Sequence, residues 1–407
     1  MDRGTLTGGP PYTGISGTPA KEEDYTLDAV GNWAGYVKKT AGSTELNQTR
    51  THNGVNEITG ITPANPWINP TYDDAGNMIT APKPGAEGTR IHMKYDAWNR
   101  MVEVRNDSGG SPGTLIITCR YDGLTRRIQK IVAGSPDVTY DYYYSGYQVV
   151  ETRKGGDTDP LEQYVWDIRY VHSPACRFRD SDGNDSLDET LYYSNDANFN
   201  VTALIEPDGD VVERVVYDPY GKPTFYDGSW ANPSATSAYA NDVLYTGHRL
   251  DVETGLIYGG FRYYHPTMGR WTTWDPIGYK VAMSLYESVL GNPCNIRDPY
   301  GLEPNRADAI GFDQVLEDVK TFETGLEGSM GKWLYQKLRC CAPCYVLDMA
   351  VAAVHSNASA FGTTTYSPPT TPGGSPTIKG GSPGSPLNTG LGWRYFYTSS
   401  KRLFQNP

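Results

Sequence analysis

Short hydrophobic stretches alternate with turn-forming residues over most of the first 220 positions. A tyrosine followed by an aspartate marks many of these junctions, as in Tyr72-Asp73, Tyr95-Asp96, Tyr121-Asp122 and Tyr217-Asp218. From Tyr72 onward the tyrosine-centred phrase recurs every 21 to 29 residues. Each phrase leads into polar residues with Gly or Asn, and then into a stretch that mixes apolar and polar positions. This pattern predicts a strand, a turn and a second strand.

The turn in each unit has a local explanation. In Asp73-Asp74-Ala75-Gly76-Asn77 the aspartate can bond nearby backbone amides, and Gly or Asn admits a left-handed backbone. Tyr25, Tyr143, Tyr164 and Tyr193 extend the series, and we expect a degenerate unit around His52-Asn53-Gly54. A single hairpin cannot bury its own face, so neighbouring units must stack. We therefore predict a mainly β fold, with an antiparallel repeat array over residues 21–216.

Composition and charge support this view and exclude other classes. The chain has 31 tyrosines, 45 glycines and 29 prolines, which favours β structure with many tight turns. The formal net charge is −12, with −13 in residues 1–302 and +1 in residues 303–407, and it argues against a nucleic-acid groove in residues 1–302. No apolar run reaches the length of a membrane span. Residues 1–20 lack the apolar stretch of a signal peptide, and we expect them to be disordered.

The character of the chain changes after Leu302. Residues 303–360 are expected to be helical, because five apolar residues fall on one helical face: Val315, Leu316, Val319, Phe322 and Leu326. Residues 361–390 form a Gly/Ser/Pro-rich linker that we expect to be disordered. Residues 391–407 form an aromatic tail that contains Trp393 to Tyr397. This segment shows no clear cluster of catalytic residues.

Metal binding has two weak candidates. Cys340, Cys341 and Cys344 lie close together with His355 downstream, but a second ligand pair is missing, so free thiols or a local disulfide are favoured over zinc.

The stretch with Asp180, Asp182, Asn184 and Asp188 resembles a calcium loop. It has Asp185 where such a loop needs glycine, and Leu191 where it needs glutamate. An acidic hairpin loop is the favoured interpretation and weak calcium binding is the alternative. We expect no cofactor.

The last part of the repeat region brings a family into view. The run from Tyr217 to Pro223, then Tyr245 to Tyr258, Phe261 to Pro266 and Asp275 to Gly278 is similar to the RHS-repeat-associated core domain. The Tyr-Asp units upstream resemble the YD repeats of RHS proteins. The resemblance covers about residues 20–302, with residues 217–302 as the core domain. It implies a β-sheet that spirals into a shell around a C-terminal cargo, often a polymorphic toxin domain, in a secreted or cell-surface protein.

Two Asp-Pro turns carry the candidate chemistry. Asp275 and Asp298 are 23 residues apart, and the second turn runs into Gly301 and Leu302. Two carboxyl groups held close together share a proton, so one can act as a base on water while the other polarises a carbonyl. The expected scissile bond is Leu302–Glu303, close enough for an intramolecular reaction. In family terms Arg262 matches an arginine beside this pair, and a cation there would favour the ionised partner.

Other interpretations remain open. Asp-Pro-x-Gly is also a good type I turn, and a turn could position the acid. Arg249, Asp251 and Glu253 are expected on an exposed strand face, and His248 and His265 are not spaced as a metal pair. The favoured function is a self-cleaving RHS shell with its own C-terminal segment as cargo. The alternatives are a non-enzymatic β scaffold for adhesion or carbohydrate binding, or a degraded remnant.

Overall fold

The computed structural model describes residues 2–7, 14–63, 66–280, 282–302 and 304–306, and two short strands further on. The chain divides into two compact units, Met1–Gly311 and Phe312–Pro407. In the second unit the described strands are β28 (Thr365–Ser367) and β29 (Thr377–Lys379), which pair antiparallel. These two strands lie within the expected linker at 361–390, and the rest of that range lies outside the described residues. The predicted helices of 303–360, the cysteine cluster and the aromatic tail lie outside the described residues.

The first sheet has five strands in the order β1-β4-β5-β6-β7. Its strands are β1 (Asp2–Arg3), β4 (Lys21–Leu27), β5 (Trp33–Thr40), β6 (Ser43–His52) and β7 (Ile58–Thr62). A separate pair is formed by β2 (Leu6–Thr7) and β3 (Gly14–Ile15). Disorder over residues 1–20 was therefore the wrong expectation for the described part, because β1 satisfies the backbone groups at the edge of β4.

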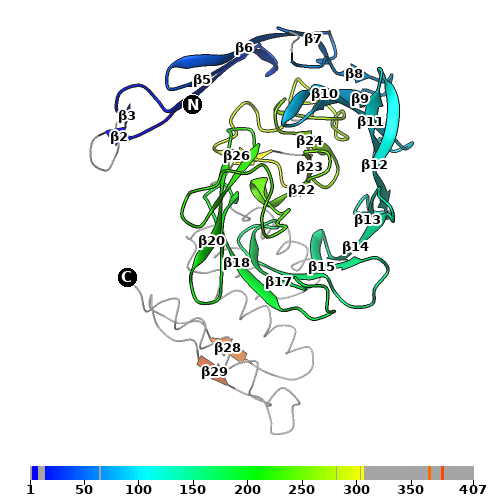
Figure 1. Ribbon diagram of the computed structural model, residues 1–407, viewed down its shortest axis with the longest axis vertical. Helices are drawn as coiled ribbons and strands as arrows, with labels where there is room; N and C mark the ends of the chain where they lie inside the picture. The colour runs from blue at the N-terminus through cyan, green and yellow to red at the C-terminus, as the bar shows by residue number, and fades with distance from the viewer. Residues whose placement is uncertain are drawn as a thin grey trace. The chain divides into compact units, whose positions relative to one another are not determined.

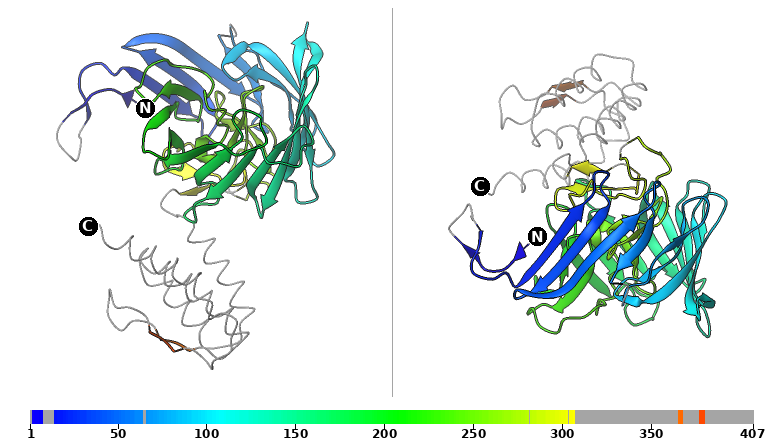
Figure 2. Two further views of the ribbon diagram at one scale, coloured as in Figure 1. Left: turned by 60° about the horizontal axis from the view of Figure 1, so that its bottom comes forward. Right: turned by 90° about the horizontal axis from the view of Figure 1, so that it is seen from above.

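The second sheet has 14 strands, and each one pairs with the next in sequence. They are β8 (Thr71–Tyr72), β9 (Met78–Lys83), β10 (Ala86–Tyr95), β11 (Met101–Ser108), β12 (Ser111–Tyr121), β13 (Arg127–Val132), β14 (Val138–Ser145), β15 (Gln148–Lys154), β16 (Glu162–Trp166), β17 (Pro174–Arg179), β18 (Glu189–Asn195), β19 (Val201–Ile205), β20 (Val211–Tyr217) and β21 (Pro223–Asp227). β21 falls within the span assigned to the core domain, yet it completes this sheet as the partner of β20. The sheet curves strongly, as Figures 1 and 2 show.

The aspartate turns at one edge of the sheet follow the predicted local geometry. Asp73 Oδ1 accepts hydrogen bonds from the amides of Ala75 (3.0 Å) and Asn77 (2.8 Å). The same pair of bonds recurs at Asp28, Asp96, Asp122 and Asp196. The third residue after each aspartate has a positive φ: Gly31, Gly76, Asn99, Thr125 and Phe199. Asn53 plays the aspartate's part in the degenerate unit, bonding the amides of Val55 and Glu57.

The aromatic residue before each turn ties one unit to the previous one. The Tyr121 hydroxyl donates to Met101 O (2.7 Å), and the Tyr217 hydroxyl to Val201 O (2.7 Å). Equivalent bonds are made by Tyr95, Tyr144 and Trp166. Tyr144 and Trp166 thus occupy this position in their units, rather than Tyr143 and Tyr164. The sequence series was misaligned there because residues close together on one strand both carry aromatic rings.

The core segment, which we define as residues 243–302, lies inside the curve of the large sheet (Figures 1 and 2). It begins with the 3-10 turn η1 (Tyr245–Gly247) and forms a four-stranded sheet from β22 (Arg249–Asp251), β23 (Leu256–Tyr258), β24 (Tyr263–His265) and β25 (Arg270–Trp271). Apolar residues from the concave face of the large sheet pack against it, with Met78, Ile91 and Ile117 in one cluster with Leu256 and Met268. β26 (Ile296–Arg297) then pairs with β27 (Asn305–Arg306).

The first sheet also contacts the core segment. Arg50 donates to Met268 O (3.0 Å), and Arg270 donates to Asn56 O (2.6 Å). Trp33 and Tyr36 pack with Tyr220, in the turn between β20 and β21. The strand series therefore curls far enough around the core segment for its first and last units to share one aromatic cluster. The mainly β fold with a curling antiparallel sheet is confirmed.

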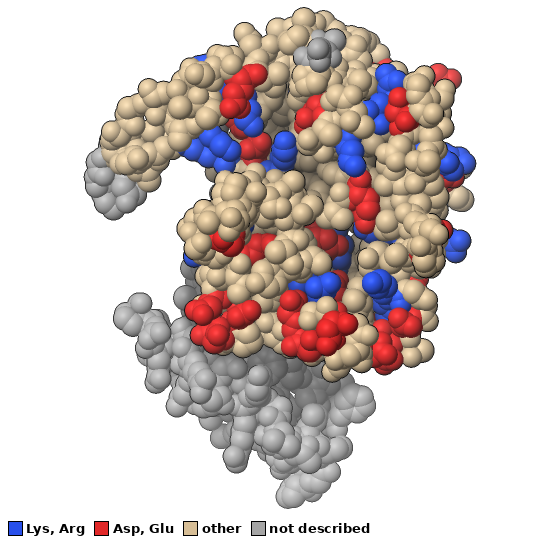
Figure 3. Space-filling model, in the orientation of Figure 1, with Lys and Arg blue, Asp and Glu red and all other residues tan. Residues whose placement is uncertain are grey.

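The visible surface carries interspersed charges of both signs. Acidic side chains gather at the lower edge in Figure 3, where β17 and β18 lie in Figure 1. Within the described residues, no helix has the length and apolar character needed to cross a bilayer.

Candidate autoproteolytic site

The two Asp-Pro turns place their aspartates close together in the core segment. Asp275 follows β25, and its amide donates to Leu285 O (3.0 Å). Its Oδ1 accepts the amide of Ile277 (2.9 Å), which closes the expected turn. Asp298 follows β26 and is 3% exposed. Leu302 follows Asp298 and is described, whereas Glu303 lies outside the described residues.

One guanidinium contacts both aspartates. Arg262 Nη2 lies 2.8 Å from Asp275 Oδ2 and 3.4 Å from Asp298 Oδ2. The arginine side chain is 1% exposed, and those of the aspartates are 11% and 2% exposed. The structure thus brings the three candidate residues together in an interior position, where charge interactions are strong.

The rest of the Arg262 side chain is fixed on all sides. Its Nη1 donates to Leu285 O (3.2 Å), and its Nε donates to Gly301 O. Its guanidinium carbon lies 4.6 Å from the centre of the Trp271 ring, within cation–π range. Burial lowers the pKa of Arg262, and the two aspartates oppose that shift. A planar guanidinium held in this way cannot move to other positions, and it therefore orients the two carboxylates.

Asp298 is hydrogen-bonded to Leu302, the residue before the expected scissile bond. Its Oδ1 accepts the Leu302 amide at 2.8 Å. Burial raises the pKa of Asp298 to about 6, with a further upward contribution from Asp275, while Arg262 and the Leu302 amide oppose the rise. A carboxyl group with this pKa keeps a proton at mildly acidic pH, as one partner of an acid–base pair needs.

The carbonyls before Leu302 are also held. His248 Nε2 donates to Pro299 O (2.9 Å), the Phe261 amide to Tyr300 O (3.0 Å), and Arg262 Nε to Gly301 O. Gly301 has φ +72°, and a Cβ there would lie 3.1 Å from the Trp271 ring. His248 and Trp271 could not be predicted as site residues, because only the folded chain places them beside the turn from Asp298 to Leu302. His248 lies within the stretch that resembles the core domain, but its position in the sequence does not indicate a contact with Pro299.

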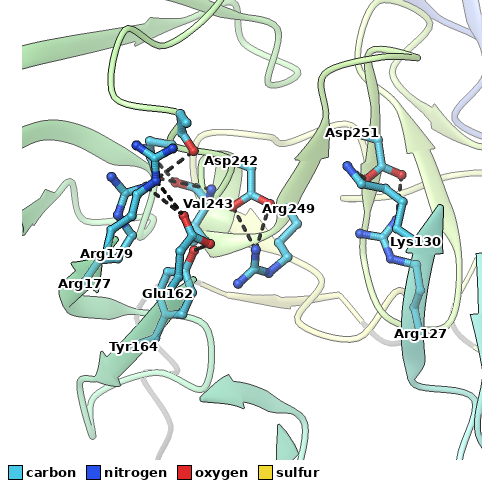
Figure 4. A network of polar contacts seen from close by, with 12 residues as sticks. Arg127, Lys130, Glu162, Tyr164, Arg177, Arg179, Asp242, Val243, Arg249 and Asp251 are labelled. Carbon is cyan, nitrogen blue, oxygen red and sulfur yellow. Dashed lines mark hydrogen bonds and ion pairs between the residues drawn. The ribbon is translucent and has the colours of Figure 1, made fainter. Parts of the chain in front are cut away.

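Charged residues of the core segment are buried, contrary to expectation. Arg249 and Asp251 are 7% and 1% exposed, not on an exposed face. Asp251 pairs with Arg127 (2.6 Å) and Lys130 (3.4 Å), both from β13. Figure 4 shows this cluster beside two others, one around Asp242 and Arg249 and one around Glu162 and Arg177. The prediction was wrong because the ion-pair partners lie on other segments, Asp242 for Arg249 and Arg127 with Lys130 for Asp251, and an alternating pattern does not reveal such pairings.

The acidic loop between β17 and β18 brings three carboxylates together. Oxygen atoms of Asp180, Asp182 and Asp188 lie within 4.8 Å of one another. Asp180 already accepts amides from Gly183 and Asp185, and Asp188 accepts the amide of Ser181. Asn184 donates its side-chain amide to Asp182 (3.1 Å). This arrangement is that of an acidic loop closed by its own backbone.

Comparison with known proteins gives the family. No family model matches the chain. It is 32% identical over 299 residues to toxin subunit YenC2 of Yersinia entomophaga, which covers 69% of this chain and 29% of that protein. It is 27% identical over 272 residues to the probable deoxyribonuclease RhsA of Dickeya dadantii, covering 66% of this chain and 18% of that protein. The chain belongs to the RHS-type proteins. Toxin protein Tse5 of Pseudomonas aeruginosa is 26% identical over 260 residues, covering 57% and 18%.

This RHS-type chain spans less than a third of the length of these curated relatives. Among solved structures, the crystal structure of TcdB2-TccC3-Cdc42 matches with a TM-score of 0.40 and 19% identity, over 70% of this chain and 17% of that one. The relatives support a toxin-related RHS shell.

Proposed function

We propose that this RHS-type protein cuts its own chain between Leu302 and Glu303 and thereby frees the segment that follows. Asp275 and Asp298 are the catalytic pair, and Arg262 is the cation that orients them. The observation that carries this proposal is the buried guanidinium shared by both carboxylates, together with the 2.8 Å hydrogen bond from the Leu302 amide to Asp298.

The chemistry is hydrolysis of one amide bond. Asp275, closer to the guanidinium, is the ionised partner and takes a proton from water as the water oxygen attacks the Leu302 carbonyl carbon. Asp298, whose pKa is raised by burial, gives its proton to the carbonyl oxygen. When the intermediate collapses, the C–N bond breaks, the leaving nitrogen receives the proton that Asp275 took from water, and Asp298 takes a proton back from a hydroxyl of the intermediate. The products are a carboxylate at Leu302 and an amine at Glu303.

The freed segment is the cargo in this proposal. Relatives carry names such as tRNA nuclease WapA of Bacillus subtilis and double-stranded DNA deaminase toxin A of Burkholderia cenocepacia. We therefore propose an effector role for residues 303–407, after secretion or display at a cell surface. Because the bond to be cut is tethered beside the catalytic pair, the reaction needs no separate substrate cleft.

A denaturing gel with mass analysis tests the cleavage. We expect the wild-type chain to yield a large fragment that ends at Leu302 and a small one that begins at Glu303. Asp275→Asn and Asp298→Asn should slow cleavage by about 10²–10⁴-fold, which is the usual contribution of one acid–base group.

Asp96→Asn is the matched control. Asp96 also closes a turn and pairs with an arginine, since its Oδ2 lies 2.7 Å from Arg100. It lies between β10 and β11 of the large 14-stranded sheet, which we call the repeat sheet. This variant should cleave at the wild-type rate. A wild-type chain that stays intact for days at pH 5 and pH 7 would refute the proposal and leave the non-enzymatic scaffold as the favoured function.

A further inference from the structure

The turn from Asp298 to Leu302 is held by three donors that come from outside it. They bind successive carbonyls, with Phe261 and Arg262 on Tyr300 O and Gly301 O, and His248 on Pro299 O. The first two donors belong to the loop that also carries the site arginine. His248 comes from a separate part of the core segment, between η1 and β22. Among these three hydrogen bonds, the one from His248 ties the turn to a second part of the core segment.

The bonds of His248 define which ring nitrogen carries the proton. Pro299 O can only accept, so Nε2 at 2.9 Å is the donor. Nδ1 is then the acceptor, and the Thr246 hydroxyl at 2.9 Å donates to it. Both nitrogens are satisfied, and the imidazole is 6% exposed. Burial lowers the pKa of His248 to about 4, so the ring is neutral in the working range.

Thr246 reaches this bond through an unfavourable backbone. Its φ of 48° and ψ of 29° lie in the left-handed region, which β-branched residues rarely occupy. Its amide donates to Asn200 Oδ1 (2.9 Å), and Gly247 next to it is so close to His172 O that a Cβ would overlap that atom. Strain of this kind persists where surrounding contacts enforce it, and it is concentrated at functional sites.

We propose that Thr246 and His248 form a positioning pair for cleavage. The Thr246 hydroxyl holds His248 in the tautomer that donates from Nε2, and that donor holds Pro299 so that the Leu302 carbonyl faces Asp275 and Asp298. This inference rests on the proposed function, and it adds two residues that do not touch the reacting atoms. Because a misplacement of about 1 Å can cost about 10²-fold in rate, one lost contact at this turn has a large effect.

The first experiment measures the first-order rate of cleavage in the full chain. His248→Met keeps the bulk and removes the donor, and we expect it to slow cleavage by about 10- to 100-fold. His248→Gln restores an amide donor at about the place of Nε2, and should cleave within about threefold of wild type. Thr246→Val keeps the shape without the hydroxyl, and should slow cleavage about fivefold, the effect of one hydrogen bond.

His172→Phe is the control. His172 is a neighbouring imidazole, with its ring centroid 4.9 Å from that of His248 and 5.9 Å from that of Tyr300, and phenylalanine keeps a ring at this place while it removes both nitrogens. Its replacement should leave the rate within about threefold of wild type if the bond from His248 is what matters. Equal slowing by His172→Phe and His248→Met, or equal slowing by the Met and Gln variants, would overturn the proposal.

The second experiment does not depend on cleavage. In the intact Asp275→Asn chain, hydrogen exchange is measured on a peptide that contains residues 299–302. We expect His248→Met to speed exchange there by about tenfold or more, and His248→Gln to leave it unchanged. If wild type does not cleave at all, the proposed function fails, and the exchange result alone decides whether His248 holds the turn. Unchanged exchange in His248→Met refutes the positioning role.

Discussion

The repeat strands and the core segment use the same kinds of residue in opposite ways. In the repeat sheet each strand pairs with the next in sequence, and a turn aspartate binds a residue four positions on. In the core segment the strands are only two or three residues long, and every residue in β22 to β25 is buried. Asp251 in β22 pairs with Arg127, which is 124 positions away in the sequence.

The difference shows where each region obtains its stability. The repeat turns are closed by bonds within five residues, so each unit forms from its own sequence once neighbours stack. Strands of two or three residues cannot hold a sheet alone. The core segment therefore depends on the curved sheet around it, and the candidate site depends on both.

Removing a charge from each region should sharpen this comparison most. Asp251→Asn leaves the guanidinium of Arg127, 1% exposed, without its counter-charge, and should lower the free energy of unfolding by about 3–5 kcal/mol. Asp96→Asn breaks an equally short Asp–Arg pair at a partly exposed turn, and should cost about 1 kcal/mol or less. Urea unfolding of both in the intact Asp275→Asn chain gives the values. Equal costs would contradict the contrast between the regions.

The pH dependence of stability should have opposite signs at Asp298 in the core segment and at Asp122 in a turn of the repeat sheet. The pKa of Asp298 is raised by burial to about 6, so the folded state binds more protons than the unfolded state between about pH 4 and pH 6. Its contribution is therefore full below pH 4 and is lost as the pH rises through 6. In the Asp275→Asn chain, Asp298→Asn should remove a loss of at most about 3 kcal/mol over that range, because the upward contribution of Asp275 to this pKa is absent there.

A turn aspartate provides the matched comparison. Partial burial tends to raise the pKa of Asp122, but hydrogen bonds from Arg126 and from backbone amides lower it overall. Its contribution is thus present at neutral pH and is lost as the pH falls. Asp122→Asn should remove a slope of the opposite sign in urea unfolding between pH 3 and pH 7. The same sign for both variants would show that the Asp298 environment is not distinct.

The smallest effect concerns the tyrosine hydroxyls. Tyr121→Phe loses the bond to Met101 O, and should cost about 1 kcal/mol. Tyr263→Phe, in the core segment, loses a bond from the charged Arg127 Nη1 (2.6 Å), and should cost about 1.5–3 kcal/mol. Thermal or urea unfolding of the two variants separates these values, and a larger loss at Tyr121 would reverse the order.

Much of the repeat architecture follows from adjacent residues. Asp73 with Gly76, and Asp96 with Asn99, encode a turn closed by their own side chains, so hairpins, their antiparallel pairing and the mainly β class could be predicted from sequence. Asp275, Asp298 and Arg262 could be named as well, through their motifs and the family resemblance. Their roles stay a prediction, whereas their meeting at one guanidinium is a property of the fold.

Tertiary structure alone decided the burial of Arg249 and Asp251 and the contact of His248 with Pro299. Arg249 pairs with Asp242 at a separation of 7 residues, His248 with Pro299 at 51, and Asp251 with Arg127 at 124. A side chain's local pattern records its polarity, but not which distant group will neutralise it. The curvature of the repeat sheet determines these pairings. It excludes water from the core segment, so each charge and hydrogen-bonding group there must be satisfied by the strand that the curvature places next to it.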